Sequence, residues 1–477
     1  MITQSASPVQ PDSTKDAHAD STRVGQKHPD TTDASHPIGE AIDKCLHRIW
    51  DIEFAARKFI PLSAKLMRRE ARGIRQELDE GYALIESSTK ATQALGVKRI
   101  GSAQERLARL QRSDIPEVLE VSLFLSLFSA YDAFSGEFLT AIYSLKPELF
   151  SRLNRSVSVG ELLGFASFEE AKHAILSAEI ETFRRKSYVE QFAELEASFG
   201  IKLREFKSWP AFVEAAQRRN LMTHANGVVS EQYLSVCRKE KCDLDHKLKA
   251  GDRLELGPAY FLSRCLLIME VVFKLGHTLW RKLLPDDLSS ADTNLHRTIY
   301  RTLRNRDWAL ASALGEFAVG LPKTSSDIEH RISVVNYAIA LKFGGRDKDS
   351  RALLAKYDWS ATIHDFRLAE AVLTDDYARA RELMIRIGKK SEIITEDSYH
   401  TFPLFNAFRE SDEFREGYQQ VYGHEYLVEV RRTVEGARID TARVLEAKEH
   451  QAESIASGQD ALPEPEVAAT STLEAAP

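Results

Sequence analysis

Apolar residues recur at helical spacing along most of this chain, and no convincing run alternates as a β-strand would. In residues 39–112 they lie among charges and predict a long helical segment; its apolar positions are Ile42, Leu46, Ile49, Phe54, Leu62, Leu66 and Ile74. The same segment is rich in basic residues, namely Arg57, Lys58, Lys65, Arg68, Arg69, Arg72 and Arg75. Interspersed acids favour a solvated helix face. The alternative is a surface that steers RNA phosphates.

A strongly apolar helix is predicted from Pro116 to about residue 145, where Pro147 stops it. It is apolar around much of its circumference, so we expect it to be central. Its apolar residues include Leu119, Leu123, Leu127, Phe128, Tyr131, Phe134, Phe138 and Ile142. Further helices are expected at about 159–177 and 181–199.

The next helix starts near Ser208, carries Pro210 in its first turn, and ends at the left-handed cap pair Asn226-Gly227. Its core-facing stripe consists of Trp209, Phe212, Val213 and Ala216. The same spacing continues to Asn220 and His224, so the stripe turns polar in its last two turns. Buried polar groups need partners. This end of the helix is therefore expected to face a polar cleft or a partner subunit.

A polar connector and a long apolar helix at about 259–284 follow, and short helices fill residues 292–423. These short helices carry small residues at positions suited to close packing: Ala309, Ala313, Ala338, Ala340, Ala369, Ala371, Ala378 and Ala380. Such spacing resembles tetratricopeptide-like stacked hairpins in style, although no strict period is present. An irregular helical bundle is the alternative.

The expected fold is all-α. It comprises a disordered tail (1–38), a long helical segment (39–112), a central helical bundle (113–285), a helical-repeat region (286–430), a terminal helix (431–450) and a second disordered tail (451–477). The tails are polar and cannot bury enough apolar surface to offset the entropy of ordering.

Composition narrows the class of protein. The chain has 477 residues and a net charge of −7, so any contact with nucleic acid must come from a local basic patch. Its four cysteines form no disulfide framework, and no apolar stretch follows Met1, which predicts a reducing cytoplasmic setting. The longest apolar run, 265–275, contains Glu270 and Lys274 and is too short to span a bilayer. We expect a soluble protein without a membrane partner.

Arg219, Asn220 and His224 suit cleavage of a phosphodiester bond without a metal. Histidine exchanges protons near neutral pH, arginine can hold a phosphate by two hydrogen bonds, and asparagine can orient either group. No cofactor motif is present. Cys237-x4-Cys242-x3-His246 lacks a fourth metal ligand, so free thiols are the expected interpretation.

Arg219-Asn220-x-x-x-His224, late in a helix between long apolar helices, resembles the R-x4-6-H motif of HEPN domains. The flanks 224–234, 250–256 and 279–282 are similar in style, and the resemblance covers about 113–285. It implies a bundle that dimerises, so that two motif helices form one metal-independent site that cleaves RNA. Such proteins are common in bacterial toxin–antitoxin, abortive-infection and antiphage systems, and the products carry 2′,3′-cyclic phosphate and 5′-hydroxyl ends.

By this resemblance Arg219 would bind phosphate, His224 would act as acid and base, and Asn220 would support them. Apart from the resemblance, Asp132 and Glu137 on the apolar helix are candidates to hold Arg219, the alternative being that they simply reach the edge of the bundle, and Arg218 is a further supporting candidate. The expected partners are RNA, a second copy of the chain, and a protein or trigger bound by the C-terminal helices. Some HEPN domains only bind, so a non-catalytic scaffold or adaptor that dimerises and binds a partner protein is the alternative.

Overall fold

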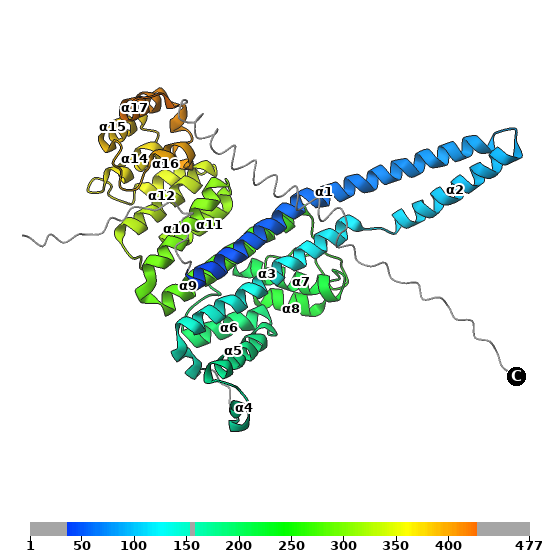
Figure 1. The fold of residues 1–477 in the computed structure, drawn as a ribbon, viewed down its shortest axis with the longest axis horizontal. Coiled ribbons are helices and arrows are strands. Elements are labelled where there is room, and N and C mark those ends of the chain that lie inside the picture. The colour runs from blue at the N-terminus through cyan, green and yellow to red at the C-terminus, as the bar shows by residue number, and fades with distance from the viewer. Residues whose placement is uncertain (1–35, 153–157, 427–477) are drawn as a thin grey trace, which may run out of the picture. The chain divides into compact units, whose positions relative to one another are not determined.

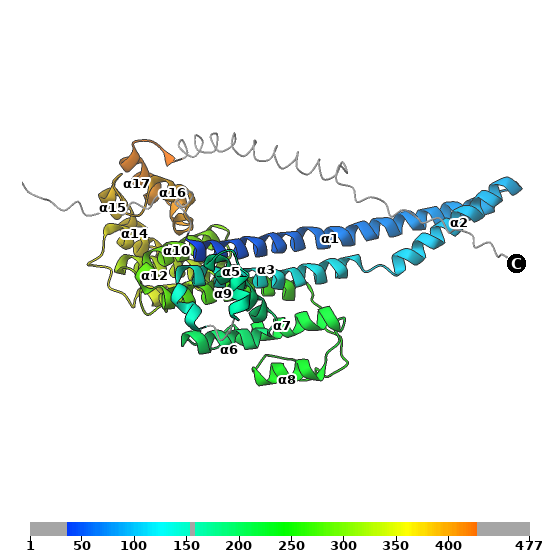
Figure 2. The same cartoon turned by 60° about the horizontal axis from the view of Figure 1, so that its bottom comes forward.

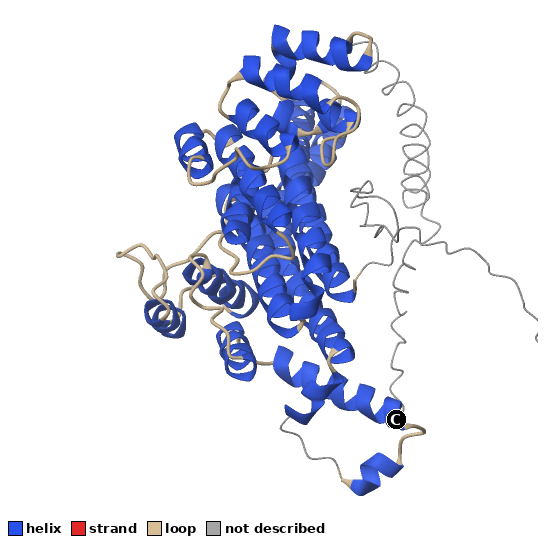
Figure 3. Cartoon of the chain, turned by 90° about the vertical axis from the view of Figure 1, so that its left-hand side faces the viewer, coloured by secondary structure: helices blue, strands red, loops and turns tan. Residues whose placement is uncertain are grey.

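The computed structural model describes residues 36–152 and 158–426, and every regular element in these ranges is a helix (Figure 3). The one β-type pairing there is an isolated bridge between Val228 and Arg253. The all-α prediction is therefore confirmed. The helices are α1 Pro37–Ile85, α2 Lys90–Gln111, α3 Ile115–Leu145, η1 Pro147–Arg152, α4 Val159–Leu163, α5 Phe168–Arg184, α6 Tyr188–Phe199, α7 Trp209–His224, α8 Glu231–Lys239, α9 Pro258–Leu283, η2 Pro285–Asp287, α10 Leu288–Arg304, α11 Trp308–Val319, α12 Asp327–Phe343, α13 Asp347–Leu354, α14 His364–Leu373, α15 Tyr377–Ile387, α16 Glu396–Thr401, η3 Pro403–Phe405, η4 Phe408–Glu410 and α17 Asp412–Tyr422.

The chain divides into two compact units between Tyr357 and Asp358. The first includes α1–α13 and the second includes α14–α17. The expected domain boundaries at 112/113 and 285/286 both fall inside the first unit, and they stay predictions. The terminal helix (431–450) and the tail 451–477 lie outside the described residues. The expected N-terminal tail ends too late, because Pro37 already opens α1 and Ile38 is fully buried.

The first unit is organised along α1, a helix of 49 residues. Helix α2 packs along its second half and α3 along its first half, so that the two return antiparallel to α1 (Figures 1 and 2). Two glycines let α1 and α2 approach, since a Cβ on Gly96 would lie 2.7 Å from the Gly81 carbonyl oxygen. Of the expected apolar positions of α1, Phe54, Leu62 and Leu66 are exposed. All seven of its expected basic residues are exposed as well.

Helix α3 is the central helix that its sequence predicts. It packs against α1, α5, α7 and α9. Its aromatic side chains Phe124, Phe128, Tyr131, Phe134 and Phe138 are each at most 2% exposed. By length and composition, the helical stretch Lys90–Leu145 is the one part of the described chain that could cross a membrane. Within that stretch, 39% of the most apolar window is buried in the bundle.

Serine caps set boundaries that periodicity alone misplaces. The expected helix at 159–177 is in fact α4 and α5, and Ser167 caps α5 by accepting a hydrogen bond from the Glu170 N–H. The expected helix at 181–199 likewise begins only at Tyr188, where Ser187 and Glu190 form a capping box. These caps place the junction between α5 and α6 at residues 185–187.

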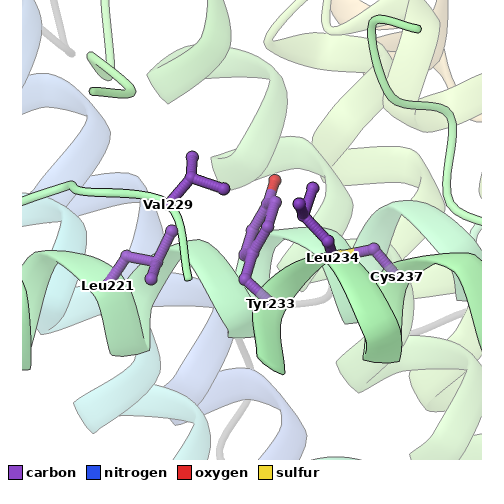
Figure 4. Close-up of a cluster of buried hydrophobic side chains, with 5 residues drawn as sticks. All are labelled: Leu221, Val229, Tyr233, Leu234 and Cys237. Carbon is purple, nitrogen blue, oxygen red and sulfur yellow. The ribbon is translucent and has the colours of Figure 1, made fainter. Parts of the chain in front are cut away.

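Helix α7 ends as its sequence predicts. Asn226 and Gly227 both adopt positive φ, at 49° and 78°. The expected polar connector instead contains α8, a helix that sequence reasoning missed. Figure 4 shows what holds α8 against the end of α7, a buried cluster made of Leu221, Val229, Tyr233, Leu234 and Cys237.

Consecutive helices from α10 to α13 pack pairwise in the first unit, and in the second unit α15 packs against both α14 and α17. Of the small residues expected at close-packing positions, Ala309 and Ala378 are exposed, so that prediction is wrong for these two. Gly315 takes this role in α11, where an added Cβ would lie 2.8 Å from Tyr337 Cβ of α12. The repeat arrangement itself stays a prediction.

Candidate functional site

Arg219 lies over α3 and α6 and is held on several sides. Its Nη2 is 3.7 Å from Asp132 Oδ2, and its Nη1 donates to Asn220 Oδ1 at 3.1 Å. The guanidinium carbon lies 6.0 Å from the Phe128 ring centroid and 5.9 Å from that of Tyr188. The side chains of Arg219 and Asp132 are 29% and 31% exposed, so both remain partly accessible to solvent.

Asp132 connects three helices at this point. It accepts a hydrogen bond from the Tyr188 hydroxyl at 2.9 Å, in addition to its ion pair with Arg219. Burial raises the pKa of Asp132, while the Tyr188 hydrogen bond and the charges of Arg219 and Arg184 act to lower it. Burial also raises the pKa of Tyr188, which keeps that hydroxyl protonated and able to donate.

His224 lies apart from this cluster. It is the last residue of α7 and is exposed, and within the described part of the chain its ring makes no hydrogen bond or ion pair. Five residues separate it from Arg219, which puts the two side chains about 140° apart around the helix. The structure therefore brings Arg219, Asn220 and Asp132 together, but not His224.

Glu137 and Arg218 have other partners. Glu137 pairs with Lys44 of α1 at 3.5 Å, so it does not hold Arg219. The Arg218 Nε donates to Glu214 Oε1 at 2.8 Å, and its guanidinium stacks on the Tyr260 ring at 4.0 Å. Since Arg218 is engaged in this way with Glu214 of its own helix and Tyr260 of α9, its expected supporting role is structural in this geometry.

Sequence reasoning missed a buried carboxylate on α7. Glu214 is 5% exposed and accepts hydrogen bonds from the Tyr233 hydroxyl of α8 at 2.9 Å and the Tyr260 hydroxyl of α9 at 2.7 Å. Arg264 lies 3.7 Å away. The Glu214 cluster fixes the position of the helix that carries Arg219.

Two further residues of the Arg219 site, Arg184 and Tyr188, were also missed. They lie on either side of the junction between α5 and α6, about 30 residues before the motif, so no helical spacing relates them to it. One signal was available: Gly136 interrupts the apolar helix α3, and a glycine inside a helix often marks the close approach of another group. Here that group is the Arg184 guanidinium.

The cavities and cysteines of the described residues lie away from the Arg219 cluster. Two cavities of about 400 Å³ and 390 Å³ lie elsewhere, one between α1 and α10 and one near Lys202 and Trp209, and neither is lined by Arg219 or His224. No group of three or more potential metal ligands occurs among residues 36–152 and 158–426. Cys237 and Cys242 are free thiols, and His246 is exposed.

Fold and site together define an all-α protein with an arginine–carboxylate cluster at the joint of α3, α6 and α7. In comparisons with known proteins, no family model, no curated protein and no solved structure matches this chain.

Proposed function

We propose that this chain is a metal-independent endoribonuclease with a HEPN-like bundle at 113–285. The observation that carries the proposal is the way Arg219 is held. It is clamped by Asp132, Asn220 and two aromatic rings, remains partly exposed, and lies five residues before an exposed histidine at the helix end. An arginine fixed in advance loses little entropy when it binds a phosphate.

The proposed reaction is transesterification within RNA. The ribose 2′-oxygen attacks the adjacent phosphorus as the bond from phosphorus to the 5′-oxygen breaks. A histidine takes the 2′-hydroxyl proton or gives one to the leaving 5′-oxygen, while Arg219 offsets charge on the phosphoryl oxygens. The products are a 2′,3′-cyclic phosphate and a 5′-hydroxyl.

The site is proposed to be composite. Within one copy, Arg219 and His224 point to different sides of α7, and the polar end of the helix is on the surface. A homodimer that brings together the α7 ends of two copies would supply Arg219 from one and His224 from the other. We place such an enzyme in the cytoplasm, in antiphage defence or a toxin-type stress response. The repeat-like helices at 286–430 would bind a trigger or partner protein.

The test is RNA cleavage in the presence of EDTA. We expect wild type to cut and His224→Ala to lose cutting while keeping its helical circular dichroism. His246→Ala is the matched control, because that side chain is 86% exposed and lies outside the cluster. The proposal fails if EDTA stops the reaction or if the His224 variant cuts as well as wild type.

A second experiment separates a toxin from an adaptor. Growth arrest on expression, relieved by Arg219→Ala, supports a regulated nuclease. A folded dimer that cuts no RNA supports the non-catalytic scaffold instead.

A further inference from the structure

We infer that Arg184 and Arg219 together form an anion site on either side of Asp132, and that this site takes a phosphodiester group of single-stranded RNA. The inference rests on the proposed function for the identity of its ligand. It adds a second cationic residue, from a different helix, to a motif that supplies only one.

Gly136 is the first observation that points to Arg184. The arginine is the last residue of α5, and its Nη2 donates to the Ala133 carbonyl oxygen of α3 at 3.4 Å. A Cβ at Gly136 would fall inside the guanidinium, so the group lies directly on the α3 backbone. Glycine weakens a helix interior relative to alanine. The approach of Arg184 gives a reason for a glycine at this position.

The unmet hydrogen-bonding capacity of Arg184 is the second observation. Among the described residues, its Nε–H is enclosed and has no hydrogen-bond partner. A planar guanidinium presents several donors and binds phosphate oxygens well in pairs. Within residues 36–152 and 158–426, its guanidinium makes one direct hydrogen bond, to a neutral carbonyl, and has no carboxylate in direct contact.

The local charge balance favours a monoanion. The charges of both arginines act to lower the pKa of Asp132, and one carboxylate cannot neutralise two guanidiniums. The neighbouring charges are already paired: Arg185 with Glu181, Lys186 with Glu194, and Glu137 with Lys44. Counting the described residues alone, one positive charge therefore remains at the Arg184–Arg219 pair, and a phosphodiester carries one negative charge.

The surroundings strengthen such an interaction. The Phe128 and Tyr188 rings lie beside Arg219 and are buried or nearly so, which lowers the local dielectric. Arg219 then contacts the reacting phosphate, while Arg184 acts as a binding residue. Loss of Arg184 should accordingly raise KM more than it lowers kcat.

The test uses a short 2′-O-methyl RNA, which binds but cannot be cut through the 2′-oxygen. We expect Arg184→Ala and Gly136→Ala to weaken binding about tenfold or more, as the loss of one hydrogen bond to a charged group implies. The slope of log affinity against log salt should fall by about 0.7, the value for one phosphate contact to a single strand. Arg184→Lys should retain part of the affinity.

Gly101→Ala is the control for Gly136→Ala. It adds the same methyl group within a helix, at a position with no atom within 4 Å, and should bind as wild type does. Circular dichroism checks that Gly136→Ala folds, and Arg184→Ala removes the same contact without adding bulk. The inference is overturned if Arg184→Ala binds with wild-type affinity and salt slope, or if the wild-type chain does not bind the RNA.

The outcomes also separate the inference from the proposed function. If the chain binds the RNA in a way that depends on Arg184 but cuts no natural RNA, the anion site stands and the proposed nuclease activity is wrong. If cutting depends on His224 but the Arg184 variants bind RNA as wild type does, the nuclease activity stands and the proposed anion site is wrong.

Discussion

Replacing Glu214 should destabilise the first unit more than any surface change. Its side chain is 7% exposed and that of its partner Arg218 is 14% exposed, so water cannot take over the lost interactions. Removing one member of a buried ion pair typically costs about 3–5 kcal/mol. Glu214→Ala also leaves the Tyr233 and Tyr260 hydroxyls without their acceptor. We expect a loss of about 4 kcal/mol in the free energy of unfolding.

Two further variants test the origin of that loss. Glu214→Gln keeps the size and one acceptor oxygen but removes the charge, and should cost about 2 kcal/mol, within the range for hydrogen bonds to charged groups. Glu231→Gln, on the exposed first turn of α8, is the control and should change stability by less than about 0.5 kcal/mol.

The assay is urea unfolding followed by circular dichroism and tryptophan fluorescence. The chain has two compact units, so two transitions are expected and must be fitted separately. The loss should be confined to the transition of the unit that contains α7. A Glu214→Ala protein within about 1 kcal/mol of wild type would refute the claim that this cluster fixes α7.

Two other predictions concern stability. Burial and the nearby charge of Glu53 raise the pKa of Asp307 to about 6 from 3.8, so its stabilising protonated form is lost as pH rises through 6. The Asp307→Asn variant should therefore have a free energy of unfolding about 1–2 kcal/mol higher than wild type at pH 8, and a similar one at pH 4; the figure allows for the partial exposure of Asp307. Equal unfolding midpoints of the two proteins at pH 8 would contradict this. Gly315→Ala should lower stability by about 1–3 kcal/mol, because its Cβ would meet Tyr337 at 2.8 Å; an unchanged or raised melting temperature would refute the close packing of α11 on α12.

The local features of α7 could be predicted because they depend on neighbours in sequence. Its core stripe follows the helical repeat, and Phe212, Val213 and Ala216 are buried. Its end follows from the tolerance of Asn226 and Gly227 for positive φ. The central position of α3 could be predicted for the same reason, because its apolar residues cover more of the helix surface than a single face.

The sequence offered Asp132 and Glu137 as partners of Arg219 but could not choose between them, because the choice depends on how helices pack. Asp132 and Glu137 are five residues apart on α3, so they face different neighbours: Asp132 meets Arg219, and Glu137 meets Lys44 of α1. The contribution of Tyr188 depends on where α6 begins. The expected small residues failed for a similar reason: Ala309 and Ala313 are four residues apart on α11, yet Ala309 is exposed and Ala313 is partly buried.

The central claim is that a histidine and an arginine of this chain promote attack by a ribose 2′-oxygen. The most direct measurement is end-group analysis after incubation of an RNA, and of its fully 2′-O-methylated counterpart, with wild type and His224→Ala in EDTA. The account predicts fragments with 2′,3′-cyclic phosphate and 5′-hydroxyl ends from the unmodified RNA and wild type alone. Fragments with 5′-phosphate ends, cutting of the methylated RNA, or equal cutting by His224→Ala would contradict it.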